Sequence, residues 1–215
     1  MVDWALIANL GTALGTTLLA VATFASTRSA NRAARTAERA LLEGLRPILF
    51  PSRWSDPPQK VGFADGKWIV VPGGRVTIEL TPEAIYIVLS VRNAGRGVAV
   101  LHGWQMPLLS DAAPAAPEEF HRLTRDIYVP TDDAGFCQIA MRDRGAEDAM
   151  RIASRVERQT SFWIDVLYGD TEGAQRIISR FAVARGPAEN GHGDEWALSV
   201  ARHWNLDLPE PRARA

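Results

Sequence analysis

The sequence predicts a mainly β protein, in which an antiparallel β-sandwich follows a long N-terminal α-helix that crosses a membrane and continues beyond it. Residues 4–25 form an apolar run without a charged side chain. Residues 26–46 are rich in helix formers and contain no proline, and Pro47 ends the run. After Pro47, hydrophobic residues alternate with polar ones, and turn signals recur about every 8 to 12 residues.

The apolar run is predicted to be a transmembrane helix, within a segment that covers residues 1–25. A helix of this length spans about 30 Å, which is enough to cross a bilayer. A cleaved signal peptide is one alternative: Ala20-Val21-Ala22 resembles a cleavage site, but residues 1–27 contain no Lys or Arg for a basic n-region. A buried core helix is the other, although such helices rarely run this far without a charge. Both alternatives stay open.

The charges that flank this helix predict its orientation. Asp3 precedes it, whereas five arginines follow it at positions 28, 32, 35, 39 and 46. Because basic flanks stay in the cytoplasm, we expect a plasma-membrane protein with its N-terminus outside and its C-terminal domain in the cytoplasm. Arg28 and Arg32 lie within about 10 Å of the membrane edge by helix rise, so we expect them to contact lipid headgroups.

Residues 26–46 are predicted to form an amphipathic juxtamembrane helix with arginines on one side and alanines on the other. If this helix continues the membrane helix, its small residues lie near the same side as a GxxxG motif, which lets two helices approach closely. The resulting hypothesis is a parallel homodimer with a seam of small residues: Gly11, Gly15, Ala30, Ala34, Ala37 and Leu41. The alternatives are that the alanines pack on the protein's own β domain or only reflect its composition.

The β domain is expected over residues 47–206, with a flexible tail over residues 207–215. Its first strands are predicted at residues 48–50, 61–64, 67–71, 75–80 and 84–93. Asp65-Gly66 lies between the second and the third of these strands. This dipeptide is a strong hairpin signal because both positions tolerate a positive φ.

The segment Val91-Arg92-Asn93-x-Gly95-x-Gly97-x-Ala99 resembles the strand–turn–strand pattern of bacterial immunoglobulin-like β-sandwich modules. The layout as a whole is similar to uncharacterised single-pass actinobacterial membrane proteins with a β-rich domain. The resemblance implies an immunoglobulin-like β-sandwich, and it implies no activity.

The remaining strands are predicted at residues 98–106, 126–129, 136–141, 161–168, 176–184 and 196–204. One helix is expected among them, at residues 146–157, because acidic residues occupy its first turn. Many strands with a single short helix favour a two-sheet sandwich over an α/β fold.

Composition and motifs point away from several classes of function. A net charge of −1 argues against nucleic-acid binding, which needs a basic surface. The single cysteine, Cys137, excludes an internal disulfide and lies in an apolar strand, where a nucleophile is not expected. The histidines match no metal-binding spacing: His102, His121, His192 and His203. His102, beside Gly103-Trp104, is expected to be packed or turn-bonded.

The acidic turns Asp132-Asp133 and Asp170-Thr171-Glu172 could hold calcium if they met at one end of the domain, but solvated turns are the simpler interpretation. No phosphate loop, nucleophile elbow or catalytic pair of carboxylates is present in the sequence. We therefore expect no enzyme, no cofactor and no metal. The expected function is a membrane-tethered interaction or scaffold module that presents a cytoplasmic β domain to a protein partner. The alternative is a membrane-bound enzyme or ligand receptor whose site is assembled from residues distant in sequence.

Overall fold

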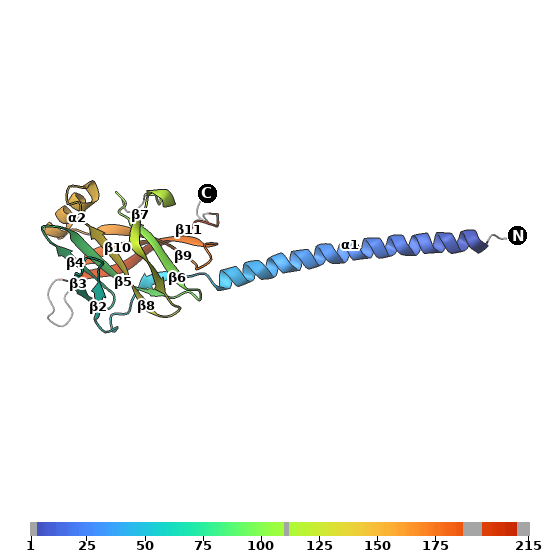
Figure 1. The fold of residues 1–215 in the computed structure, drawn as a ribbon, viewed down its shortest axis with the longest axis horizontal. Coiled ribbons are helices and arrows are strands. Elements are labelled where there is room, and N and C mark those ends of the chain that lie inside the picture. Colours follow the sequence, from blue (N-terminus) through green and yellow to red (C-terminus); the bar gives the residue numbers. More distant parts are fainter. Residues whose placement is uncertain (1–3, 110–111, 187–194, 210–215) are drawn as a thin grey trace. The chain divides into compact units, whose positions relative to one another are not determined.

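A computed structural model describes residues 4–109, 112–186 and 195–209, and the chain divides into two compact units at residues 1–44 and 45–215. The first unit is a long helix and the second is a β domain, as Figure 1 shows. The chain is therefore mainly β with a single long N-terminal helix, as its sequence predicts.

The first unit contains helix α1 (Trp4–Gly44), which is unbroken over 41 residues and about 60 Å long. It is long and apolar enough to cross a membrane by length and composition, and none of its apolar window is buried. Five threonines of α1 each donate a hydrogen bond from the side-chain hydroxyl to the backbone carbonyl oxygen four residues earlier: Thr16, Thr17, Thr23, Thr27 and Thr36. For Thr16, Thr17 and Thr23, which lie in the apolar run, these bonds let the hydroxyls sit in an apolar environment without loss of hydrogen bonding.

The described part of the β domain contains eleven strands and one α-helix close to the predicted positions, and one 3₁₀ turn that was not predicted. They are β1 (Leu49–Pro51), β2 (Gln59–Gly62), β3 (Trp68–Val71), β4 (Arg75–Leu80), β5 (Ile85–Asn93), β6 (Ala99–Gln105), η1 (Pro117–Glu119), β7 (His121–Val129), β8 (Ala134–Met141), α2 (Glu147–Glu157), β9 (Phe162–Gly169), β10 (Arg176–Arg185) and β11 (Trp196–Asn205). The main difference is β7, which begins five residues before the predicted strand at residues 126–129.

Nine of these strands form one curled antiparallel sheet, in the order β1-β5-β4-β11-β10-β9-β6-β7 with β8 also paired to β5, and β2 pairs only with β3. The junction between β4 and β11 is short, because only Val76 and Arg75 pair across it, with Trp196 and Ala197. The prediction of two separate sheets is therefore wrong at this junction, because the two-residue ladder between β4 and β11 joins the strands on either side of it into one sheet. The immunoglobulin-like assignment stays a prediction.

The main core lies inside the curl and draws on both halves of the sheet, from Ile87 and Ile139 on one side to Ile164 and Phe181 on the other. Helix α2 adds Ala149 and Ile152 to it. A second cluster lies where the β2–β3 hairpin covers the other face of β5. At the tip of this hairpin only Gly66 has a positive φ, of 84°, so Asp65 does not adopt the left-handed conformation that its dipeptide signal suggested.

The Asn93-x-Gly95-x-Gly97 motif forms a cradle for the segment through which the chain enters the β domain. The Asn93 Oδ1 accepts hydrogen bonds from the Ile48 and Gly95 amides, and its Nδ2 donates to the Gly97 and Val129 carbonyls. A Cβ on Gly95 or Gly97 would overlap the backbone of residues 45–48. The two glycines are therefore required by close packing, and neither has a positive φ.

Candidate functional site

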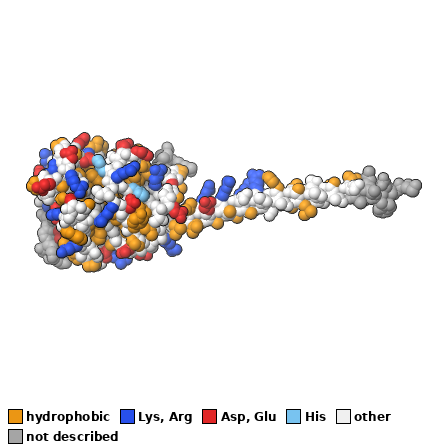
Figure 2. Space-filling model, in the orientation of Figure 1, with side chains coloured by type: hydrophobic (Ala, Val, Ile, Leu, Met, Phe, Trp, Pro, Cys, Tyr) orange, Lys and Arg blue, Asp and Glu red, His pale blue; other side chains and the backbone are white. Residues whose placement is uncertain are grey.

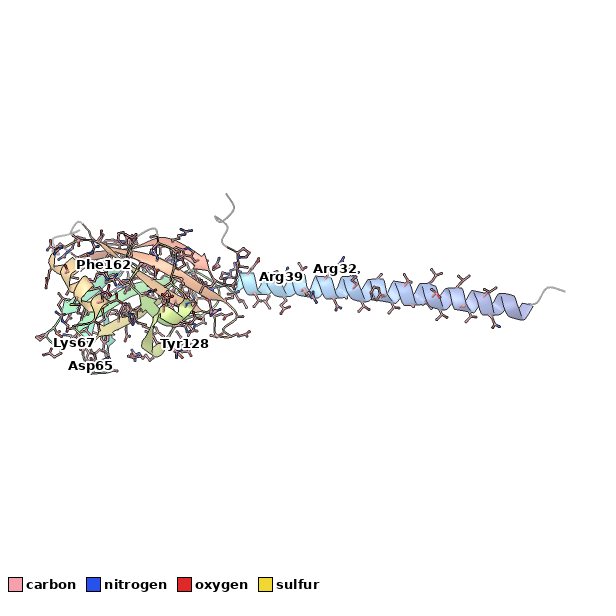
Figure 3. The ribbon with its side chains drawn as sticks, turned by 90° about the horizontal axis from the view of Figure 1, so that it is seen from above. Arg32, Arg39, Asp65, Lys67, Tyr128 and Phe162 are labelled. Carbon is pink, nitrogen blue, oxygen red and sulfur yellow. The ribbon has the colours of Figure 1, made fainter. Side chains whose placement is uncertain are left out.

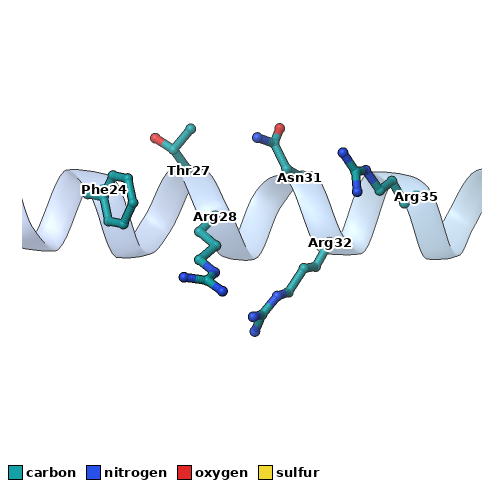
Figure 4. A pocket seen from close by; sticks show the side chains of 6 residues that line it. All are labelled: Phe24, Thr27, Arg28, Asn31, Arg32 and Arg35. Atoms are coloured by element: carbon teal, nitrogen blue, oxygen red, sulfur yellow. The ribbon is translucent and has the colours of Figure 1, made fainter.

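A basic and aromatic segment lies in the middle of α1, where the apolar run ends. Figure 4 shows its side chains: Phe24, Thr27, Arg28, Asn31, Arg32 and Arg35. Phe24 is 70% exposed, and in Figure 4 the guanidinium groups of Arg28 and Arg32 project to the same side of the helix. Figure 2 shows basic side chains gathered along one side of this helix. An aromatic ring followed by guanidinium groups suits the boundary between acyl chains and headgroups.

The predicted dimer seam lies entirely on α1, whose continuity across residues 25 and 26 is the condition that the seam requires. A Cβ on Gly11 or Gly15 would have no neighbour within 4 Å, so packing within the first unit requires neither glycine. Ala30, Ala34, Ala37 and Leu41 are likewise not buried. The seam stays a prediction.

The histidines and the cysteine of the described residues do not converge. His102 is on β6, His121 on β7 and His203 on β11, while His192 lies outside the described residues. Burial raises the pKa of the Cys137 thiol to about 12, which leaves it unreactive in the folded domain. In the part of the chain that the structure describes, no three His, Cys, Asp or Glu side chains are placed to hold a metal ion.

In the two acidic turns, the aspartate carboxylates contact groups of their own or a neighbouring turn or strand. Asp133 accepts a hydrogen bond from the Ala134 amide at 2.8 Å, and Asp170 accepts one from the Gln175 amide at 3.3 Å. Asp132 lies 3.8 Å from Arg92. The solvated-turn interpretation accounts for these contacts.

Two buried polar groups were not foreseen from the sequence. The first is an ion pair in which Arg180 donates to both carboxylate oxygens of Asp165, at 2.7 Å each, with both side chains almost fully buried. These residues face each other across β9 and β10, and Arg180 also donates to the Ala112 carbonyl at 2.8 Å. The pair therefore fixes a loop on the sheet. Burial raises the pKa of the Asp165 carboxyl, and the Arg180 guanidinium opposes this change.

The second is a chain of hydrogen bonds through Tyr168, Ser179 and His203. The Tyr168 hydroxyl accepts from the Leu49 amide and lies 2.9 Å from the Ser179 hydroxyl, which in turn lies 2.6 Å from the His203 Nδ1. A serine beside a histidine suggests a nucleophile, but Ser179 is fully buried and its oxygen is committed to this chain. The arrangement connects β1, β9, β10 and β11.

A groove crosses the place where the curled sheet does not close. β7 and β8 are consecutive, but no backbone ladder joins them in the described residues. The Arg125 guanidinium spans the opening, donating to the Gln138 side chain at 3.2 Å and the Gly62 carbonyl at 3.3 Å. The groove has a volume of about 400 Å³ and is lined by Lys60, Val61, Gly62, Phe63, Trp68, Arg125, Phe136 and Gln138.

Two exposed aromatic side chains belong to strands that border this groove. Trp68 of β3 is 64% exposed and Tyr128 of β7 is 59% exposed. In Figure 3, Tyr128 and the turn that carries Asp65 and Lys67 lie along the same side of the domain. Exposed aromatic rings beside arginine are typical of residues that dominate protein–protein interfaces.

Fold and surface together define a β-domain protein with one candidate membrane-spanning helix near its N-terminus. No protein-family model matches the chain, and no curated protein matches it in sequence. Among solved structures, a crystal structure of a protein from Archaeoglobus fulgidus is similar over 63% of this chain and 96% of that chain, with 13% identity and a TM-score of 0.23. At this TM-score the likeness carries no argument about fold or function.

Proposed function

We propose that this protein is a single-pass membrane protein that tethers a non-enzymatic interaction domain to the cytoplasmic face of the plasma membrane. The observation that carries the proposal is the apolar half of α1, where Leu14, Leu18 and Leu19 are each more than 60% exposed. Such a surface favours an apolar environment, and the hydrocarbon core of a bilayer supplies one. The arginines that follow it favour the cytoplasmic side for the β domain.

The groove between β7 and β8 is the surface proposed to bind the partner. An open sheet edge offers backbone donors and acceptors to an added strand, and Lys60 and Arg125 give the groove a positive charge. The occupant that fits is an extended, acidic segment of a cytoplasmic protein. Trp68 would contact its apolar side chains.

Two finer assignments belong to the same proposal. The motif at residues 91–99 supports kinship with immunoglobulin-like domains of actinobacterial membrane proteins, because it builds a defined strand–turn–strand unit. The unbroken α1 supports a parallel homodimer through the seam of small residues.

Cysteine labelling tests the topology. Ser55 is exposed in the β domain, and native Cys137 is buried, so the background reaction is low. With a membrane-impermeant maleimide, we expect Ser55→Cys to react only in permeabilised cells and Val2→Cys to react in intact cells. Labelling of Ser55→Cys in intact cells would reverse the proposed orientation.

Proximity labelling from the C-terminus tests the groove. We expect Trp68→Ala to remove at least one protein from the labelled set, while Met150→Ala, a change at a residue 56% exposed on α2, leaves the set intact. An identical set in the wild type and both variants would exclude the groove as the partner site.

One observation favours the alternative of a ligand receptor or enzyme. A cavity of about 310 Å³ brings together Glu147, Asp148 and Arg151 of α2 with Asp165 of β9, which are groups distant in sequence. Asp148 forms an ion pair with Arg151, and its Oδ2 lies within hydrogen-bond distance, 2.9 Å, of the His121 Nε2. Saturable binding of a small molecule that Glu147→Gln abolishes would support this second function.

A further inference from the structure

His102 lies where strand β6 departs from regular pairing with both of its neighbours. On the β9 side, Leu101 pairs with Tyr168 and Gly103 pairs with Leu167, so His102 is an extra residue in the ladder. On the β7 side, the pairing moves from Ile127 directly to Arg122 over the same step of β6. Coincident bulges of this kind re-aim side chains and are frequent beside functional sites.

Two glycines make room for this distortion. A Cβ on Gly103 would lie 2.8 Å from the His121 carbonyl oxygen, and one on Gly169 would lie 3.2 Å from the His102 Nε2. Larger side chains at these positions would displace β7 or the imidazole. The position of His102 therefore depends on the backbone of three adjacent strands, in the order β7-β6-β9.

The bulges open a hollow of about 570 Å³, which we name the His102 pocket. The lining residues that could contact a ligand in this pocket include His102, Phe120, Arg122, Asp126, Leu167 and Arg176. Phe120 and Leu167 are buried members of an apolar cluster, so one wall of the pocket is apolar. The size is within the range of small-molecule sites.

The charge of the pocket is positive and only partly neutralised. Arg122, Arg125 and Arg176 line it against the single carboxylate of Asp126. Arg125 is engaged by Gly62 and Gln138, whereas in the described part of the chain the Arg122 and Arg176 guanidinium groups have no hydrogen-bond or ion-pair partner. By contrast, Arg46, Arg142 and Arg180 are each paired with a carboxylate.

We propose that the His102 pocket binds the phosphate group of a small organic phosphate, with Arg122 and Arg176 as its charge partners and Leu167 and Phe120 against the organic part. Guanidinium groups match the geometry of phosphate oxygens and bind them in pairs of hydrogen bonds. His102 at the bulge supplies an uncharged hydrogen-bonding group, because burial lowers its pKa more than Asp126 and Asp170 raise it. The same chemistry could come from a soluble phosphate ester or from the headgroup of an anionic lipid.

Calorimetry with phenyl phosphate on the full chain in phosphatidylcholine nanodiscs tests the proposal. We expect saturable binding that is tighter than that of inorganic phosphate, because the ring contacts the apolar wall, and no binding of benzyl alcohol. Arg122→Gln and Arg176→Gln should each weaken binding about tenfold. Arg96→Gln, which removes an exposed arginine from the turn after β5, is the matched control and should bind as the wild type does.

A second measurement separates loss of binding from loss of folding. In protein labelled with ¹⁵N-histidine, phenyl phosphate should shift the His102 resonances and leave those of His203 in place, and Cys137 should stay unreactive to thiol reagents in every variant. No saturable binding in the millimolar range, or equal binding by wild type, Arg122→Gln and Arg176→Gln, would overturn the proposal. In discs that contain phosphatidylglycerol, competition with phenyl phosphate would identify a lipid source, and unchanged binding a soluble one; either supports the phosphate site.

Discussion

Arg180 is fully buried, and its contacts show how one charged residue can organise a loop and two strands. Asp165 accepts two of its hydrogen bonds, the Ala112 carbonyl accepts a third, and the guanidinium lies 4.8 Å from the centre of the Trp204 ring. A buried pair of this kind is a weak source of net stability compared with apolar residues. Its effect is on specificity, since no other register of β9 against β10 pairs both charges.

We predict that Asp165→Ala destabilises the protein by about 3 to 5 kcal/mol, because it leaves the Arg180 charge buried without its carboxylate. Urea unfolding of the full chain in detergent, followed by tryptophan fluorescence, measures this change. Lys67→Met is the control. It removes an ion pair with Glu79 in which both side chains are more than a third exposed, so it should cost less than about 1 kcal/mol. Equal effects of the two substitutions would contradict the role given to Asp165.

Gly97→Ala should also be strongly destabilising, by about 2 kcal/mol or more, because its Cβ would overlap the Leu45 carbonyl. Gly173→Ala is a useful comparison, since Gly173 has a φ of 73° but open space around it, and only the conformational cost of about 1 kcal/mol applies. Thermal unfolding of both variants gives the order of stability. A Gly97→Ala protein as stable as Gly173→Ala would show that the cradle adjusts freely.

The sequence pattern at residues 91–99 identified residues that are structurally important, but it did not predict their role. The motif predicted a strand–turn–strand unit, and the structure shows that Asn93, Gly95 and Gly97 hold the chain at residues 45–48. Single residues such as Ser179 and His203 could not be paired in advance, because their contact depends on the register between β10 and β11. Asp165 and Arg180 were unpredictable for the same reason.

At the scale of elements, α1 is the element whose secondary structure depends most on its local sequence. Good helix formers from residue 26 onward and an uninterrupted apolar run before them predict one continuous helix, and the structure contains it. Strand positions were likewise predictable from alternation. The bulge at His102 and the short β4–β11 junction were not, because both arise from pairing between segments far apart in the chain.

The dimer hypothesis makes its prediction at this scale. Ala34→Cys should form a disulfide-linked dimer under mild oxidation in membranes, because Ala34 lies in the seam of small residues. Arg39→Cys is the control, since it lies about 140° away around the helix and should not crosslink. Non-reducing gel electrophoresis distinguishes them. Equal crosslinking at both positions, or none at Ala34, would contradict the seam.

At the scale of the whole molecule, stability should depend on pH through the half-buried histidines His102 and His203. Burial lowers the pKa of His203 from 6.5, so the folded state holds fewer protons than the unfolded state just below that pH. Stability should therefore be complete above about pH 6.5 and fall as the pH drops toward the lower folded pKa, with a slope of at most about 1.4 kcal/mol per pH unit for this group. His102 acts in the same direction.

Replacing His203 by asparagine should reduce this slope between pH 5 and 7. Urea unfolding at several pH values measures it. The carboxyls of Asp65 and Asp207 have lowered pKa values and lose their contribution only below about pH 4, as the pH falls through their folded pKa. A His203→Asn protein with the wild-type slope would show that this histidine is not the titrating group.

The cradle at residues 45–48 also determines how the protein would respond to mechanical load. A pull along the helix enters the β domain through this segment, where Asn93 holds the Ile48 amide and Arg46 is paired with Asp207. Beyond it, β1 pairs with β5 over only three residues. These contacts would yield before the rest of the sheet does. Releasing residues 45–51 would take Leu49 out of the core and lengthen the tether by up to about 24 Å, while the other strands stay paired. The domain would then remain attached and intact under a brief force, with a longer reach from its anchor.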